Sequence, residues 1–170
     1  MEKDLKSLIL SIRGRPGSQM VMDLIAGNER MLKQLTELLV SGDPLLLQRG
    51  VWPLYLLSEK YPEKLSPYLS RLVKLLDEPH HHPAVYRNIT GLLQYTVIRP
   101  SQEGRIMNTC FSLLASPATA VAAKVNCLTV LKRLSEKHPE ILPELKLLTR
   151  ELYDQQPVSF RARARKEKLI

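Results

Sequence analysis

The segment Leu57-Ser58-Glu59-Lys60-Tyr61-Pro62-Glu63-Lys64-Leu65 returns 77 residues later as Leu134-Ser135-Glu136-Lys137-His138-Pro139-Glu140-Ile141-Leu142. Seven of the nine positions are identical, and the same offset matches Leu75 with Leu152. Half of this offset is about 38 residues, which is typical of repeats built from two helices. The chain is therefore expected to contain an internal repeat of helix pairs, with a further copy between these two.

Prolines mark the places where the helices of this repeat are expected to begin. A proline suits the first turn of a helix because the amide that it lacks would have no partner there. Pro44, Pro83 and Pro117 are expected to open the first helix of a unit, and Pro157 a final half unit. Within the units, a second break separates the two helices at Tyr61-Pro62, Arg99-Pro100 and His138-Pro139.

The spacing of apolar residues predicts helices in each of these segments. Apolar side chains that recur every three or four residues lie on one side of a helix. Two such stripes follow the breaks, one at Leu65, Leu69, Leu72, Val73 and Leu76 and one at Ile141, Leu145, Leu148 and Leu152. The pattern over the whole chain predicts about nine helices and no strand.

Three shorter stripes precede the repeat. They are Leu5, Leu8, Ile9 and Ile12; Met20, Val21, Leu24 and Ile25; and Met31, Leu32, Leu35, Leu38 and Leu39. The sequences Gly14-Arg15-Pro16-Gly17 and Gly27-Asn28 are expected to break the chain between them, because glycine and proline interrupt helices. Asn28 is a candidate cap for the helix that follows.

The break pattern Ser-Glu-Lys-x-Pro-Glu, with small residues such as Ala122, Ala123 and Cys127 in the preceding helix, resembles HEAT repeats of the armadillo-like superfamily. The resemblance covers roughly residues 18 to 170 and extends to small stand-alone HEAT-like bacterial proteins of unknown role. It implies an all-α, right-handed superhelix of about four helix pairs and a C-terminal capping helix, whose second helices line a binding surface. We expect one domain, 1–170, with units at about 18–43, 44–82, 83–116 and 117–156 and a closing helix at 157–170.

The composition favours a globular protein of the cytoplasm. Apolar residues make up 44% of the chain and charged residues 25%, which is ordinary globular usage. Cys110 and Cys127 lie in apolar helical stretches and are expected to be free thiols. The charged N-terminus lacks the pattern of a signal peptide, and no apolar stretch approaches the length of a membrane span.

The net charge of +8 is unevenly distributed along the sequence. Residues 161–170 carry five basic residues against Glu167, so half of the net charge lies in this segment. Arg161, Arg165 and Lys168 share one side of the expected last helix, while Phe160, Ala164, Leu169 and Ile170 supply apolar contacts. This helix is expected either to cap the repeat stack or to bind a partner electrostatically.

Enzymatic and metal-binding interpretations find less support in the sequence. His80, His81 and His82 could attract zinc, but consecutive side chains point in different directions, and an exposed loop before the helix at Pro83 explains them better. His138 replaces Tyr61 in the repeat, which indicates a structural turn. HEAT-like DNA glycosylases share the expected architecture, although the single tryptophan, Trp52, is better explained by core packing. The sequence Gly17-Ser18-Gln19-Met20 resembles only faintly a loop of fumarase-type lyases.

The sequence thus predicts a non-enzymatic interaction module without a cofactor, which binds a protein or peptide partner on its second helices. The alternative is a nucleic-acid-binding protein that uses a basic groove and the C-terminal helix; an enzyme is the third and least supported class. The candidate partner-binding residues are the polar members of the second helices and the basic tail: Lys64, Arg71, Lys74, Arg105, Asn108, Lys146, Arg150, Arg161, Arg165 and Lys168.

Overall fold

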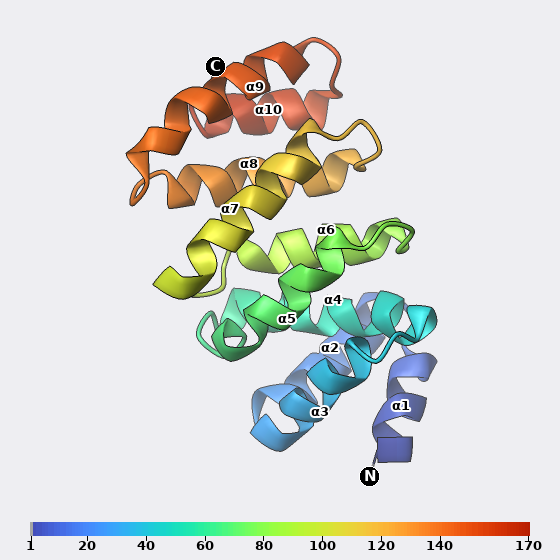
Figure 1. Ribbon diagram of the computed structural model, residues 1–170. Coiled ribbons are helices and arrows are strands. Elements are labelled where there is room, and N and C mark those ends of the chain that lie inside the picture. Colours follow the sequence, from blue (N-terminus) through green and yellow to red (C-terminus); the bar gives the residue numbers. More distant parts are fainter. Residues whose placement is uncertain (1) are drawn as a thin grey trace. The chain divides into compact units, whose positions relative to one another are not determined.

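The computed structural model of the chain describes residues 2–170, with side chains from residue 5 onward. Among these residues the regular elements are ten α-helices and three short 3-10 helices, with no strand (Figure 1). The all-α fold class is therefore confirmed, with one α-helix more than the nine expected. No helix in this described part of the chain has both the length and the apolar character needed to cross a membrane.

The chain divides into two compact units, one that ends at Ile98 and one that spans Arg99–Ile170. The elements of the first unit are α1 (Glu2–Ser11), α2 (Gly14–Ala26), α3 (Glu29–Leu39), α4 (Pro44–Lys60), η1 (Ser66–Tyr68), α5 (Leu69–Lys74), η2 (Leu75–Asp77) and α6 (Pro83–Leu93). Those of the second unit are α7 (Pro100–Ala115), α8 (Val121–Leu134), η3 (Pro139–Ile141), α9 (Leu142–Tyr153) and α10 (Val158–Lys166).

In the first unit, α4 is the central helix. It packs against α2 on one side and α6 on the other, and it also contacts α1 and α3. Gly50 of α4 allows a tight contact with α3, since an added Cβ would lie 2.4 Å from Cδ2 of Leu39. Since α2 and α4 are first helices of successive pairs, this arrangement is the packing of paired helices expected from the repeat.

In the second unit, α8 takes the corresponding central place. It packs against α7, α9 and α10, and α9 and α10 also contact each other. Cys110 of α7 and Cys127 of α8 are both fully buried and free, as expected. A side-chain hydrogen bond to Cys110, together with burial, raises the pKa of the Cys127 thiol well above its usual value, so this cysteine is not a reactive thiolate.

Side chains at the helix starts explain some of the observed helix boundaries. Asn28 caps α3 by accepting a hydrogen bond from the Met31 amide (3.0 Å). Asp43 precedes Pro44 and accepts from the amides of Leu45 (3.0 Å) and Leu46 (3.1 Å). Such caps satisfy amides that have no partner within the helix.

Two expected boundaries are wrong. Pro117 does not open a helix, because it lies in an exposed turn and α8 begins only at Val121. The stretch Gly14–Gly17 is not a break but the first turn of α2. This turn tolerates Pro16 because amides in the first turn of a helix need no intrahelical partner. The chain instead leaves the helix at Ile12 and Arg13. Within the expected closing segment, 157–170, α10 spans Val158–Lys166.

The apolar stripe of the α5 region is confirmed, because Leu65, Leu69, Leu72 and Val73 are fully buried. The stripe expected in α2 is wrong in part. Met20 and Leu24 are 50% and 46% exposed, and the helix instead buries Ser18, Val21, Met22 and Ile25. Ser18 is compatible with this buried position because its hydroxyl donates to the Gly14 carbonyl (3.2 Å).

Candidate interaction surface

Three of the candidate residues belong to the first unit, on or beside α5. The buried side of this short helix is formed by Leu69, Leu72 and Val73, which leaves Arg71 and Lys74 exposed. Lys64 lies in the turn that precedes η1 and is half-buried. Its ammonium group lies 5.7 Å from the centroid of the Tyr61 ring, so part of its charge is engaged in a cation–π contact.

Two candidates, Arg105 and Asn108, lie three residues apart on α7 and are both exposed. The opposite side of α7 is buried through Ile106, Cys110 and Leu114. Residues three apart are neighbours on a helix surface. Arg105 and Asn108 therefore lie side by side on the exposed side of α7.

The remaining candidates lie on α9, on α10 and just after α10. Lys146 is half-buried and Arg150 is exposed on α9, next to the buried residues Leu145 and Thr149. On α10, Arg161 is half-buried and Arg165 is exposed. Nη1 of Arg165 donates a hydrogen bond to the hydroxyl of Tyr153, at the end of α9, over 2.5 Å. The structure thus brings the cations of these two helices to adjoining surfaces.

The helix α10 is held in place by a different side from the one that carries these cations. Phe160, Ala164 and Leu169 are fully buried, whereas Ile170, which was expected to join them, is 50% exposed. Towards α8, Arg163 donates to the hydroxyl of Thr129 (2.6 Å), and that hydroxyl donates to Glu167 (2.6 Å). Capping and partner binding are therefore compatible, because separate sides of α10 are available for each. Lys168 follows α10 with a positive φ of 57° and is exposed.

A cluster of charged residues in the second unit was not predicted from the sequence. Glu103 of α7 is only 5% exposed, and its two carboxylate oxygens contact Nζ of Lys137 (2.9 Å) and Nε2 of His138 (2.7 Å). Nδ1 of His138 also lies 3.4 Å from Glu140. A signal was present, because Glu103 falls in the same helical stripe as Ile106 and Cys110, and a charge in an apolar stripe requires a partner.

This cluster shifts the pKa values of both central groups. Hydrogen bonds from Lys137 and His138 lower the pKa of the Glu103 carboxyl. The hydrogen bond to Glu103 raises the pKa of His138. Because carboxylates face both nitrogens of the ring, the protonated histidine is satisfied on each side. This arrangement ties the turn after α8 to α7, in agreement with the prediction that His138 belongs to a structural turn.

The loop that contains His80, His81 and His82 makes local structural contacts. His82 caps α6, with its Nδ1 accepting a hydrogen bond from the Ala84 amide (3.1 Å). Nε2 of His81 lies 3.2 Å from Glu78, and its ring packs against Tyr86 with the centroids 6.1 Å apart. Among the residues that the structure describes, no three histidine, cysteine or acidic side chains are grouped in a way that could hold a metal ion.

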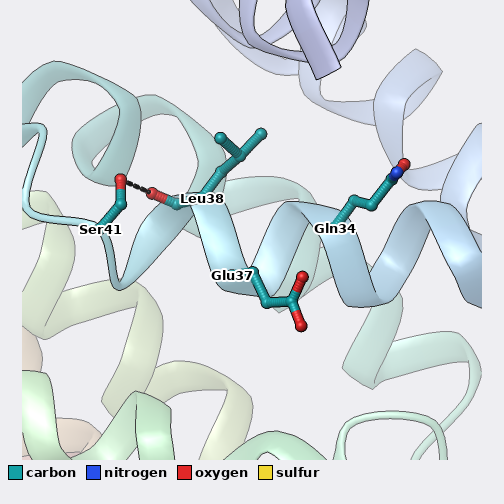
Figure 2. Close-up of a pocket in the computed structure, with 4 residues that line it drawn as sticks. All are labelled: Gln34, Glu37, Leu38 and Ser41. Carbon is teal, nitrogen blue, oxygen red and sulfur yellow. Dashed lines mark hydrogen bonds between the residues drawn. The ribbon is translucent and has the colours of Figure 1, made fainter. Parts of the chain in front are cut away.

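Trp52, the residue compared with the aromatic side chains of DNA glycosylases, is half-buried on α4 rather than fully in the core. A hollow of about 210 Å³ lies over α3 and the turn after it, lined by Gln34, Glu37, Leu38 and Ser41. Figure 2 shows that these side chains point in different directions and that the hydroxyl of Ser41 is directed to the Leu38 carbonyl, to which it donates (2.7 Å). Without converging polar groups, this hollow lacks the features of a ligand site.

The comparison with protein families agrees with this architecture. A family model described as a HEAT repeat domain matches residues 9–167 of the chain. The chain therefore belongs to the HEAT repeat family, whose members usually mediate protein binding and are usually non-catalytic. No curated protein and no solved structure shows significant similarity to it.

Proposed function

We propose that the chain is a non-enzymatic interaction module that binds a protein or peptide partner through its second helices, α5, α7 and α9. The observation that carries the proposal is the division of each of these helices into two sides. One side is buried through apolar residues, and the other carries the exposed candidates Arg71, Lys74, Arg105, Asn108 and Arg150. Such a division leaves polar side chains exposed on each of these helices, where a partner can contact them.

Site-specific photocrosslinking in nuclease-treated cell extract tests this proposal. A photoreactive amino acid at Lys74, Asn108 or Arg150 should crosslink to a protein that can be identified and then rebound in purified form. The matched control positions are Leu24 and Glu59, which are exposed on the first helices α2 and α4. Crosslinks that arise only from Leu24 and Glu59 would refute the assignment to the second helices.

Nucleic-acid binding is the second candidate function, and the distribution of charge favours it. The second unit, residues 99–170, contains 13 lysines and arginines against 7 acidic residues, and thus carries +6 of the net charge of +8. Neutralising several phosphates releases counterions, so affinity for a labelled duplex should fall steeply as salt rises. A titration that detects no binding to duplex or single-stranded probes at low salt would exclude this candidate.

A further inference from the structure

The helices α9 and α10 together carry a surface on which one sign of charge dominates. We call this surface the α9–α10 face and define it by Lys146, Arg150, Tyr153, Val158, Arg161 and Arg165. On α9, the first three of these residues lie at offsets of 4 and 7; on α10, the last three lie at offsets of 3 and 7. Residues at these offsets share one side of a helix. The hydrogen bond from Arg165 to Tyr153 joins the two sides into one surface.

The cations of this face lack acidic partners within the protein. Among the described residues, none of Lys146, Arg150 and Arg161 forms an ion pair. The helices do contain carboxylates, but these lie elsewhere. Glu144 and Glu151 are on the far side of α9, and Glu167 is bonded to Thr129. Asp154 is close to the face in the sequence, since it directly follows Tyr153 at the end of α9.

The internal repeat shows how unusual these cations are for their positions. At the offset of 77 residues, Lys146 and Arg150 correspond to Leu69 and Val73 of the first unit, which are both fully buried. If these positions were polar only to keep the surface soluble, residues of either charge would serve equally well. Here the cations are gathered on one side and the carboxylates of α9 on the other. A surface with this separation of charge is electrostatically suited to an acidic ligand.

We propose that the α9–α10 face binds an acidic segment of a partner protein, with carboxylates at the four cations and an apolar side chain against Val158. Val158 is 67% exposed and shares the side of α10 that carries Arg161 and Arg165, so the face offers an apolar contact among its charges. An apolar contact of this kind suits a peptide side chain better than a phosphate backbone. The inference rests on the proposed function and names the partner chemistry for one part of that surface.

A direct binding titration tests this inference. The probe is a fluorescently labelled short peptide of glutamates with a central leucine, and the readout is anisotropy at low salt with the full chain. The double variant Arg150→Glu with Arg161→Glu should weaken the affinity by about tenfold or more, since two attractive contacts become repulsive. Val158→Asp should also weaken binding of this peptide. The loss of affinity caused by Val158→Asp should be smaller for a second peptide in which serine replaces the leucine.

The matched control is Arg30→Glu with Lys166→Glu, which changes the net charge by the same amount at exposed positions outside the face. Its affinity should stay close to that of the wild type. An equal loss in both double variants would mean that only net charge matters, and an absence of peptide binding to the wild type would equally overturn the inference. Unchanged circular dichroism melting curves for the variants exclude unfolding as the cause of a loss.

Further outcomes distinguish this inference from nucleic-acid binding and from the proposed function. If a single-stranded nucleic acid of equal charge binds more tightly than the peptide and the same double variant abolishes its binding, the face is a nucleic-acid interface. If a photocrosslinked protein partner still binds the Arg150→Glu with Arg161→Glu variant with wild-type affinity, the inference fails while the proposed function stands. If none of the photoreactive residues on the second helices crosslinks to a protein, the proposed function itself is contradicted.

Discussion

The helix pairs α4–α5 and α8–α9 share nearly the same sequence at the turn between their two helices, yet they present different surfaces. Their first helices start 77 residues apart, at Pro44 and Val121, which is the offset of the internal repeat. Their second helices differ in what they bury. The α5 helix buries Leu69, Leu72 and Val73, whereas α9 fully buries only Leu145 and Thr149. The difference indicates that the same pair of helices buries its second helix more fully in the first unit than in the second.

The first helices also differ at one position that controls packing. Gly50 of α4 corresponds to Cys127 of α8 at the same offset. The glycine allows Leu39 of α3 to approach the α4 backbone, while the cysteine fills its place by contacting Cys110 of α7. Close approach in one copy and a filled contact in the other are therefore two solutions to packing a second helix against the next first helix.

Phe160→Ala should give the largest effect, because the ring is fully buried and holds α10 on the second unit. We expect a loss of about 3 to 5 kcal/mol in the free energy of unfolding. Chemical denaturation followed by circular dichroism measures it. Val158→Ala is the control on the same helix and should change stability by less than about 0.5 kcal/mol. Similar small values for both variants would mean that α10 does not cap the unit.

Leu69→Ala and Leu145→Ala compare the two second helices directly. Both side chains are fully buried, so each truncation should cost about 2 to 5 kcal/mol, measured by denaturant unfolding. Leu147, which is 58% exposed on α9, is the control, and its truncation should cost less than about 0.5 kcal/mol. A loss at Leu69 without one at Leu145 would show that α9 contributes little to the second unit.

Gly50→Ala tests the close approach of α3 and α4. The added methyl group would lie 2.4 Å from Cδ2 of Leu39, which is itself fully buried and has little room to move. Overpacking should outweigh the better helix propensity of alanine and leave a net loss of about 1 to 2 kcal/mol in the free energy of unfolding. Gly104→Ala on α7 meets no atom within 4 Å and should instead stabilise by up to about 1 kcal/mol. A stabilised Gly50→Ala variant would disprove the tight contact.

The smallest expected effect is a dependence of stability on pH. It arises at the repeat position that is Tyr61 in the first copy and His138 in the second. His138 has a pKa raised above its usual 6.5, so its stabilisation is fully present below pH 6.5 and is lost as the pH rises through the folded-state pKa. Glu103 has a pKa lowered from 4.5, so its contribution is present above pH 4.5 and is lost as the pH falls through the folded-state value.

The variant His138→Tyr, which copies the residue of the first unit, should remove the upper of these two transitions. The stability difference between wild type and variant should be larger at pH 6 than at pH 8.5, as measured by denaturation at the two values. Tyr61→His is the reciprocal control and should create no such difference, because the partner of His138 is Glu103 of the second unit. A pH-independent difference would mean that the ion pair does not stabilise the folded chain.

The candidate surface was predicted in part from the sequence. Exposed cations such as Arg71 and Arg150 could be assigned to the outward side of a helix, because the neighbouring apolar stripe fixes which side is buried. The contact between Glu103 and His138 could not be predicted, since it joins a helix, α7, to a turn 35 positions away in the sequence. The meeting of Arg165 with Tyr153 likewise depends on how α10 lies beside α9.

The sequence by itself determined the helical class, the pairing of helices and most of the breaks between them. Periodicity, caps and prolines act over a few residues, so these features are encoded locally. The failure at Pro117 has the opposite cause, because a proline suits an exposed turn as well as a first helical turn and only packing selects between them. The tertiary structure alone decided which sides of α8, α9 and α10 meet. That choice follows from burying Phe160 and Leu145 together with their distant neighbours, and it thereby places the unpaired cations on one face.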